Sequence, residues 1–233
     1  MRIRCQPIRR IVSLGAACVV AVLSATAADW PEWRGAGRLG AWNETGIIET
    51  FPDEGLTYTW RVPIRGGYSG PAVADGRVFV TDFERGEANQ GIERALALDE
   101  KSGEILWIHE WPVDYTGLMG SYAIGPRATP TVDGRRVFVQ GAMGSLFCLD
   151  VKSGKVRWKK DYVADYGTEV PVWGMVGAPL VEGDLLIALV GGENDAKVVA
   201  FNKKNGREVW RALSSDWEPG YAPPFMVEAG GVR

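Results

Sequence analysis

The chain has 233 residues, of which 46% are hydrophobic, with a formal net charge of −3 and a single histidine. A chain of this length can bury a sizeable core without disulfides or metals. Its mild acidity argues against a surface that binds nucleic acid or an anionic membrane. Because the sequence has a single histidine, a zinc site with two or more histidine ligands is excluded.

The first 27 residues are predicted to be a secretory signal peptide. Arginines precede an apolar run over residues 11–23, and a small-residue Ala-x-Ala site ends at Ala27. The run is too short to cross a hydrocarbon core of about 30 Å, so we expect an exported chain, periplasmic or secreted, without a transmembrane segment. Four arginines and no acids leave with the signal, which takes the net charge from −3 to −7. Lipidation at Cys18 is an open alternative, although the preceding residues lack the large aliphatic residue of a lipobox.

Three eleven-residue segments repeat along the rest of the chain. They read ALDEKSGEILW at residues 97–107, CLDVKSGKVRW at 148–158 and AFNKKNGREVW at 200–210. The Asp or Asn can hydrogen-bond the backbone of the turn that follows it. The glycine supplies the positive φ of a tight hairpin with a bulge, and the tryptophan packs against the neighbouring unit. The predicted docking positions are Asp99, Gly103, Trp107, Asp150, Gly154, Trp158, Asn202, Gly206 and Trp210. Cys148, the one cysteine after the signal, occupies a small buried position of this motif and has no disulfide partner.

A second repeated element precedes each motif. A short strand with a proline (Pro71, Pro130, Pro179) leads into an acidic-glycine turn and then an apolar strand. Each unit of about 50 residues therefore contains four short antiparallel strands with no amphipathic helix among them. This pattern predicts an all-β fold, a β-propeller of four-stranded blades. Residues 56–62, with Trp60, resemble an isolated outer strand, and a fourth proline strand begins at Pro224.

At these residues the sequence resembles the pyrroloquinoline-quinone-like (PQQ-like) repeat propellers, whose docking motif reads Ala-x-Asp-x-x-Thr-Gly-Lys-x-x-Trp. The resemblance covers residues 28–233, one predicted propeller repeat domain, and residues 29–35 (DWPEWRG) are similar to the start of a secreted bacterial branch. It implies a ring of seven or eight blades, of which about 3–4 are present here. The chain is then expected to be the N-terminal part of a longer propeller, truncated at its C-terminus, and the missing blades are its first expected partner.

The resemblance covers two functional classes. One contains quinoprotein dehydrogenases of alcohols or sugars, which use PQQ and usually Ca²⁺. The other contains cofactor-free propellers, including the lipoprotein that helps to assemble outer-membrane β-barrels. The alcohol dehydrogenases carry adjacent cysteines over the cofactor, and this sequence has no adjacent pair. We therefore expect a non-catalytic scaffold of the cell envelope that has no cofactor and binds another envelope protein or peptide. A quinoprotein-type dehydrogenase with PQQ and Ca²⁺, or a fragment of one, is the alternative.

A candidate binding rim follows from the alignment of the proline strands. Tyr68, Arg127, Val176 and Tyr221 each lie three residues before a proline, and inner strands line the central channel of a propeller. Trp173 and Tyr122, in the preceding connections, are predicted to join them. An aromatic rim with one arginine suits an extended peptide or an anionic ligand, and packing between blades is the alternative. No catalytic residue is predicted. His109 is expected to be a solvated strand residue, and the oxygen-rich residues 193–195 a turn rather than a Ca²⁺ site.

Overall fold

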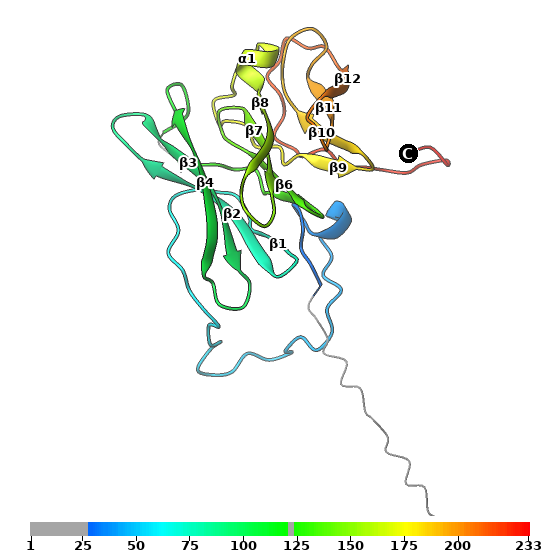
Figure 1. The fold of residues 1–233 in the computed structure, drawn as a ribbon. Coiled ribbons are helices and arrows are strands. Elements are labelled where there is room, and N and C mark those ends of the chain that lie inside the picture. Colours follow the sequence, from blue (N-terminus) through cyan, green and yellow to red (C-terminus); the bar gives the residue numbers. More distant parts are fainter. Residues whose placement is uncertain (1–27, 121–123) are drawn as a thin grey trace, which may run out of the picture.

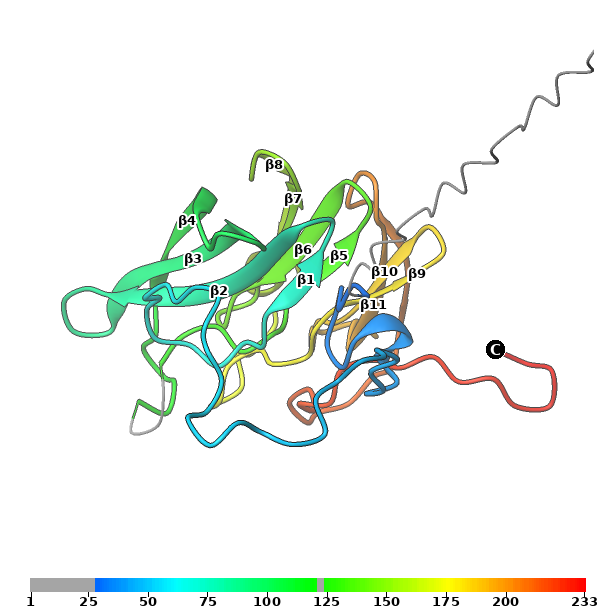
Figure 2. The same cartoon turned by 90° about the horizontal axis from the view of Figure 1, so that it is seen from below.

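The computed structural model describes residues 28–120 and 124–233, which form three four-stranded antiparallel sheets side by side (Figures 1 and 2). The first sheet consists of β1 (Ala72–Ala74), β2 (Arg77–Arg85), β3 (Gln90–Asp99) and β4 (Ile105–Asp114). The second consists of β5 (Thr131–Asp133), β6 (Arg136–Gln140), β7 (Ser145–Asp150) and β8 (Val156–Asp161). The third consists of β9 (Leu180–Glu182), β10 (Leu185–Leu189), β11 (Val198–Asn202) and β12 (Glu208–Ala212). Strands pair in chain order within each sheet, which confirms the predicted blades.

Local turn chemistry explains this order. Between β1 and β2 the two turn residues, Asp75 and Gly76, have φ values of 52° and 70°. Positive φ at both positions is the type I′ geometry, which matches the twist of antiparallel strands. The corresponding turns of the other two sheets place Gly134 and Gly183 at positive φ. The short first strands β1, β5 and β9 contact one another in sequence and form the inner edge of the arc.

The hydrophobic core lies between the blades. One cluster joins the first and second sheets and includes Phe79, Ala97 and Leu149. Another joins the second and third sheets and includes Cys148 and Phe201. The second sheet, which lies between the other two, therefore buries both of its faces, as propeller blades do when they stack.

Two local features differ from the sequence prediction. The structure records no strand within residues 56–62, although Trp60 still docks on the first sheet as described below. A short helix, α1 (Tyr162–Tyr166), follows β8. Asp161 caps it by accepting a hydrogen bond from the Ala164 amide, and Gly167 ends it at a φ of 65°. The helix places Tyr162 and Tyr166 in the core between the second and third sheets.

Within the described residues, no helix is long and apolar enough to cross a membrane.

Candidate functional site

The docking tryptophans connect each blade to the next. Trp60 lies on Gly103, Trp107 lies on Gly154, and Trp158 lies on Gly206. A Cβ atom built on any of the three glycines would come within 2.6–2.7 Å of the tryptophan ring, so only glycine permits this approach. Each indole also donates a hydrogen bond to the carbonyl of the residue after the Asx position. The indole acceptors are Glu100 at 2.8 Å, Val151 at 2.9 Å and Lys203 at 3.1 Å.

The turns that receive these tryptophans have the predicted construction. The Asp99 side chain accepts hydrogen bonds from the Lys101 and Ser102 amides, and the Asp150 side chain accepts from the two equivalent amides of its turn. The Asn202 side chain accepts from the Lys204 amide alone. The small residue of each motif lies directly opposite its tryptophan on the next strand, and a bulge follows it. Cys148 is therefore small because Trp158 faces it. Burial raises the pKa of its thiol to about 12, so it is an inert core residue.

An N-terminal clamp, residues 30–40, fastens the inner strands together. Trp30 and Val73 of β1 exchange two backbone hydrogen bonds of 2.8 and 2.9 Å, and the Val132 amide of β5 donates to the Pro31 carbonyl at 2.8 Å. Gly35, at a φ of 76°, lets the chain fold back onto the Trp30 ring. The clamp thus joins the first two blades at their inner edge.

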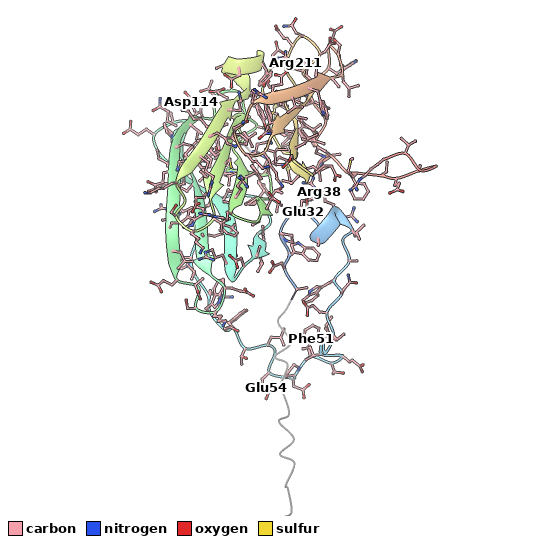
Figure 3. The ribbon with its side chains drawn as sticks, turned by 45° about the vertical axis from the view of Figure 1, so that its right-hand side comes forward. Glu32, Arg38, Phe51, Glu54, Asp114 and Arg211 are labelled. Atoms are coloured by element: carbon pink, nitrogen blue, oxygen red, sulfur yellow. The ribbon has the colours of Figure 1, made fainter. Side chains whose placement is uncertain are left out.

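Arg38 extends the clamp to the third blade. Its side chain is only 1% exposed and forms an ion pair of 2.7 Å with Glu32 (Figure 3). The guanidinium also donates to the carbonyls of Ala178, Pro179 and Pro224. An arginine fork can satisfy several buried carbonyls at once. One side chain therefore holds both the residues leading into β9 and the fourth proline segment.

The structure brings together most of the predicted rim. The Arg127 guanidinium carbon lies 5.6 Å from the centre of the Tyr68 ring, within the range of a cation–π contact. Arg127 also lies close to Gly174, the neighbour of Trp173, because a Cβ built on that glycine would come within 3.3 Å of the guanidinium. Burial raises the pKa of Tyr221, Glu218 raises it further, and Arg127 lowers it. Tyr68 is 53% exposed, whereas Arg127, Trp173 and Tyr221 are half-buried. Tyr122 lies outside the described residues.

A buried carboxylate that the sequence did not predict lies close enough to Arg127 of the rim to feel its charge. Glu93 of β3 is fully buried and accepts hydrogen bonds from the Trp111 indole (2.7 Å), the Tyr115 hydroxyl (2.6 Å) and the Ala142 amide (2.9 Å). Burial raises the pKa of Glu93, while its three donors and nearby Arg127 lower it. Since Ala142 belongs to the second blade, Glu93 connects two blades through a polar contact.

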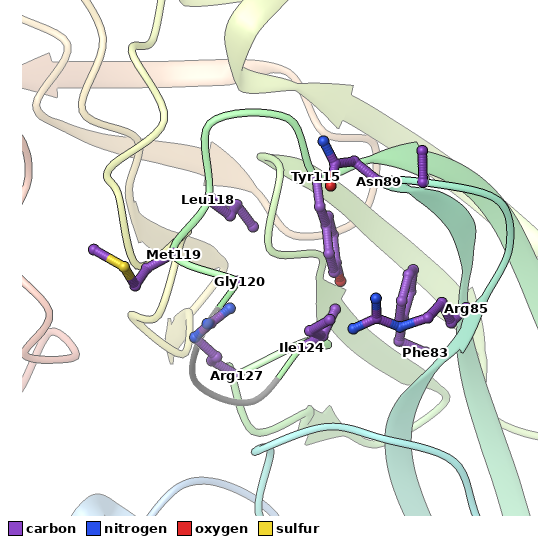
Figure 4. Close-up of a pocket in the computed structure, with 10 residues that line it drawn as sticks. Phe83, Arg85, Asn89, Tyr115, Leu118, Met119, Gly120, Ile124 and Arg127 are labelled. Carbon is purple, nitrogen blue, oxygen red and sulfur yellow. The ribbon is translucent and has the colours of Figure 1, made fainter.

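Arg127 of the rim and Tyr115, whose hydroxyl donates to Glu93, both line a small cavity (Figure 4). Phe83 and Tyr115, stacked with their centres 4.5 Å apart, form one wall, and Ile124 and Arg127 form another. The cavity encloses about 40 Å³. This is room for a water molecule or two and far less than the roughly 300–1,000 Å³ of typical ligand pockets.

The part of the chain that the structure describes contains no cluster of side chains with the make-up of a metal site. No three His, Cys, Asp or Glu side chains there converge as metal ligands. Residues 193–195 form a turn in which the Ala196 amide donates to the Glu193 carbonyl. His109 lies on β4, as predicted, but it is not the solvated residue that the sequence led us to expect. Its ring is half-buried between Trp111 (5.6 Å between centres) and Phe147 (4.9 Å), and this burial lowers its pKa.

The fold and the docking contacts define a class: blades of a β-propeller joined by tryptophan-docking turns. The family model that matches the chain is described as "Outer membrane protein assembly factor BamB" and covers residues 57–124 and 93–222. The chain belongs to this PQQ-like repeat family.

Known relatives include proteins named as quinohemoprotein and quinoprotein dehydrogenases. The chain is 25% identical over 173 residues to quinohemoprotein alcohol dehydrogenase ADH-IIG of Pseudomonas putida. This alignment covers 72% of this chain and 23% of that protein. The chain is 29% identical over 157 residues to quinoprotein ethanol dehydrogenase of Pseudomonas aeruginosa, covering 63% of this chain and 23% of that one. The structure of quinohemoprotein alcohol dehydrogenase from Comamonas testosteroni matches with a TM-score of 0.58 at 20% identity, over 80% of this chain and 28% of that chain. This last match supports the fold alone. The chain spans about a quarter of the length of the curated relatives it matches.

Proposed function

We propose that this chain is an exported, non-catalytic binding scaffold of the cell envelope, and that its rim holds an extended, acidic segment of another envelope protein. The observation that carries the proposal is the pairing of Arg127 with the exposed Tyr68 ring, 5.6 Å apart. A half-buried cation beside an exposed aromatic ring offers one charged and one apolar contact to a peptide. The description of the family and the predicted signal peptide support the envelope as the compartment.

Site-specific photo-crosslinking tests the proposal in cells that produce the chain. A benzoylphenylalanine at position 68 should crosslink to a discrete envelope protein. The matched control is position 58, because Tyr58 is 72% exposed and carries its own arginine, with the Arg61 guanidinium carbon 4.4 Å from its ring centre. Equal crosslinking at both positions would show only general surface stickiness and would contradict a binding rim.

Substitutions at the same two pairs give a second readout. Arg127→Gln and Tyr68→Ala should reduce the yield of the crosslinked or co-purified partner at least fivefold, with little change in melting temperature. Arg61→Gln and Tyr58→Ala should reduce neither. Unfolding caused by Tyr68→Ala would make Tyr68 a packing residue and remove the site.

A quinoprotein-type dehydrogenase is the second candidate, favoured by the relatives named above. Three observations on the residues present favour the scaffold over this candidate. The sequence has no adjacent cysteines. Among the described residues no three His, Cys, Asp or Glu side chains gather as metal ligands, and both oxygens of Glu93 already accept hydrogen bonds from the protein. Titration with PQQ and CaCl₂, followed by dye reduction with ethanol or glucose, distinguishes the two candidates. Turnover of an alcohol or sugar would overturn the scaffold proposal.

A further inference from the structure

The docking turn of the third blade differs from the other two at the residue before its glycine. A serine stands there in the first two motifs, whereas Asn205 precedes Gly206 in the third. The Asn205 side-chain oxygen accepts a hydrogen bond from the Arg207 amide at 3.0 Å. Ser102 makes the equivalent contact with the Glu104 amide at 3.2 Å. The asparagine therefore keeps the turn, and it creates the single Asn-Gly pair of the sequence.

An Asn-Gly pair can deamidate because glycine has no side chain to shield its amide nitrogen. In this turn the Gly206 nitrogen would attack the carboxamide carbon of Asn205. A C–N bond forms, the amide proton passes to the leaving group, and NH₃ departs, which leaves a five-membered succinimide. Water then opens this ring at either carbonyl carbon and gives aspartate or isoaspartate. The net change is the gain of one water and the loss of one ammonia, so no oxidant or other reactant is needed.

The docked turn holds this reaction off. Gly206 is buried, and its amide donates a hydrogen bond to the Asn202 carbonyl at 2.8 Å. A Cβ on the same glycine would lie 2.7 Å from the Trp158 ring, so the indole covers the turn closely. The nitrogen must leave its hydrogen bond before it can attack, and this requires a local opening of the turn.

The charges around Asn205 favour the reaction once the turn opens. Asn205 and Arg207 are both exposed, and Arg207 forms no ion pair with the described residues. Lys203 and Lys204 add two more cations, although each pairs with a neighbouring carboxylate, at 2.8 and 3.0 Å. Positive charge favours the deprotonated form of a nearby group, here the amide nitrogen that attacks.

We propose that Asn205 is a deamidation site gated by the docking of Trp158, and that its conversion to isoaspartate releases the third blade irreversibly. Isoaspartate adds one methylene to the main chain directly before Gly206. The turn then cannot hold its glycine against the Trp158 ring and keep the hydrogen bond to the Asn202 carbonyl. The Trp158 indole also loses its acceptor, the Lys203 carbonyl at 3.1 Å.

Incubation of the purified protein at pH 8 and 37 °C tests the gate, with peptide mass spectrometry to follow conversion at Asn205. Trp158→Phe removes the indole hydrogen bond but keeps an aromatic ring, and conversion should be at least fivefold faster than in the parent. Trp107→Phe is the matched control, because it loosens the preceding docking contact and should leave the rate at Asn205 unchanged. The parent alone gives a second measure, since it should convert at least tenfold more slowly than the chain unfolded in urea. Equal rates in the two variants, or in the folded and unfolded parent, would overturn the gate.

Urea denaturation of aged protein tests the release. The aged parent should unfold at lower urea than fresh parent, whereas ageing should not change Asn205→Ser, which carries the residue of the other two motifs. Asn205→Asp separates the new charge from the longer main chain and should unfold with the fresh parent. An aged parent that contains isoaspartate at position 205 and still unfolds with the fresh protein would show that the third blade is not released.

Discussion

Trp107 of the first blade and Gly154 of the second meet so closely that a Cβ on the glycine would lie 2.7 Å from the indole ring. The same tryptophan donates a hydrogen bond of 2.9 Å to the Val151 carbonyl, in the turn that Gly154 completes. One side chain therefore fixes both the spacing and the register of two blades. In a repeat architecture, where each unit contacts only its neighbours, such contacts provide most of the coupling between units.

Loss of a docking tryptophan should destabilise the protein according to its neighbours. Trp158→Ala removes a side chain that is 9% exposed between two blades, and we expect a loss of about 3–5 kcal/mol, the range for a buried large aromatic. Trp210→Ala should cost clearly less, because Trp210 faces no blade in the described structure. Urea denaturation of both variants measures the order. Equal losses would mean that stacking between blades is not the main role of these residues.

The docking glycine can be tested separately from its backbone conformation. Gly154→Ala introduces both a strained positive φ (66°) and a clash with Trp107. Gly134→Ala is the matched control, since its φ is 53° but no atom lies within 4 Å of its Cβ position. The strain alone costs about 1–2 kcal/mol, and the clash should add about 1–3 kcal/mol more at Gly154. Similar losses at the two positions would exclude a tight Trp107 contact.

The blades could be predicted from the sequence because the residues that form each docking turn lie close together along the chain. Each motif contains its own turn, its own cap and its own tryptophan, so a window of eleven residues predicts the contact of Trp158 with the next unit. The clamp was not predictable in the same way. Arg38 donates hydrogen bonds to carbonyls that are about 140 residues later in the sequence. From sequence alone, an arginine near a glycine-rich turn is expected to be exposed to solvent, because only the tertiary structure shows its burial.

The candidate site was predicted only in part, for a similar reason. Alignment of the proline strands placed Tyr68 and Arg127 at one mouth, and the structure brings them together. Glu93 gave no signal, because charged residues alternate with apolar ones along ordinary half-buried strands. Only the stacking of a second blade, with the Ala142 amide directed at it, turns this position into a buried carboxylate.

Glu93 should make stability depend on pH. Burial raises its pKa in the folded state above the ordinary value of about 4.3. The folded protein then binds this proton more tightly than the unfolded chain, so stability falls as pH rises from the ordinary pKa toward the raised one. Glu93→Gln should remove this part of the dependence, although it loses the acceptor for the Trp111 indole. Urea denaturation between pH 4.5 and 8 measures both proteins, and parallel curves would show that Glu93 does not titrate in this window.

The buried ion pair on the first blade should contribute far more than the pairs on its surface. Asp82 and Arg94 lie opposite each other on β2 and β3, joined by hydrogen bonds of 2.6 and 2.7 Å, and Asp82 is fully buried. Asp82 also accepts a hydrogen bond from the Arg65 amide at 2.8 Å, which ties the chain before β1 to the sheet. Asp82→Ala removes the carboxylate that Arg94 hydrogen-bonds, leaving only the longer-range charges of Glu84 and Glu110, and we expect a loss of about 3 kcal/mol.

The matched comparison is Asp184, which pairs with Lys204 at 3.0 Å on the third blade with both side chains more than half exposed. Solvent and salt screen such a pair, so Asp184→Ala should leave the denaturation midpoint close to that of the parent. Added salt sharpens the contrast. Raising NaCl to 0.5 M should leave the effect of Asp82→Ala nearly unchanged, because a buried pair is weakly screened. A loss at Asp82 that shrinks with salt, or that equals the loss at Asp184, would mean that water reaches the pair and that it does not hold β2 and β3 together.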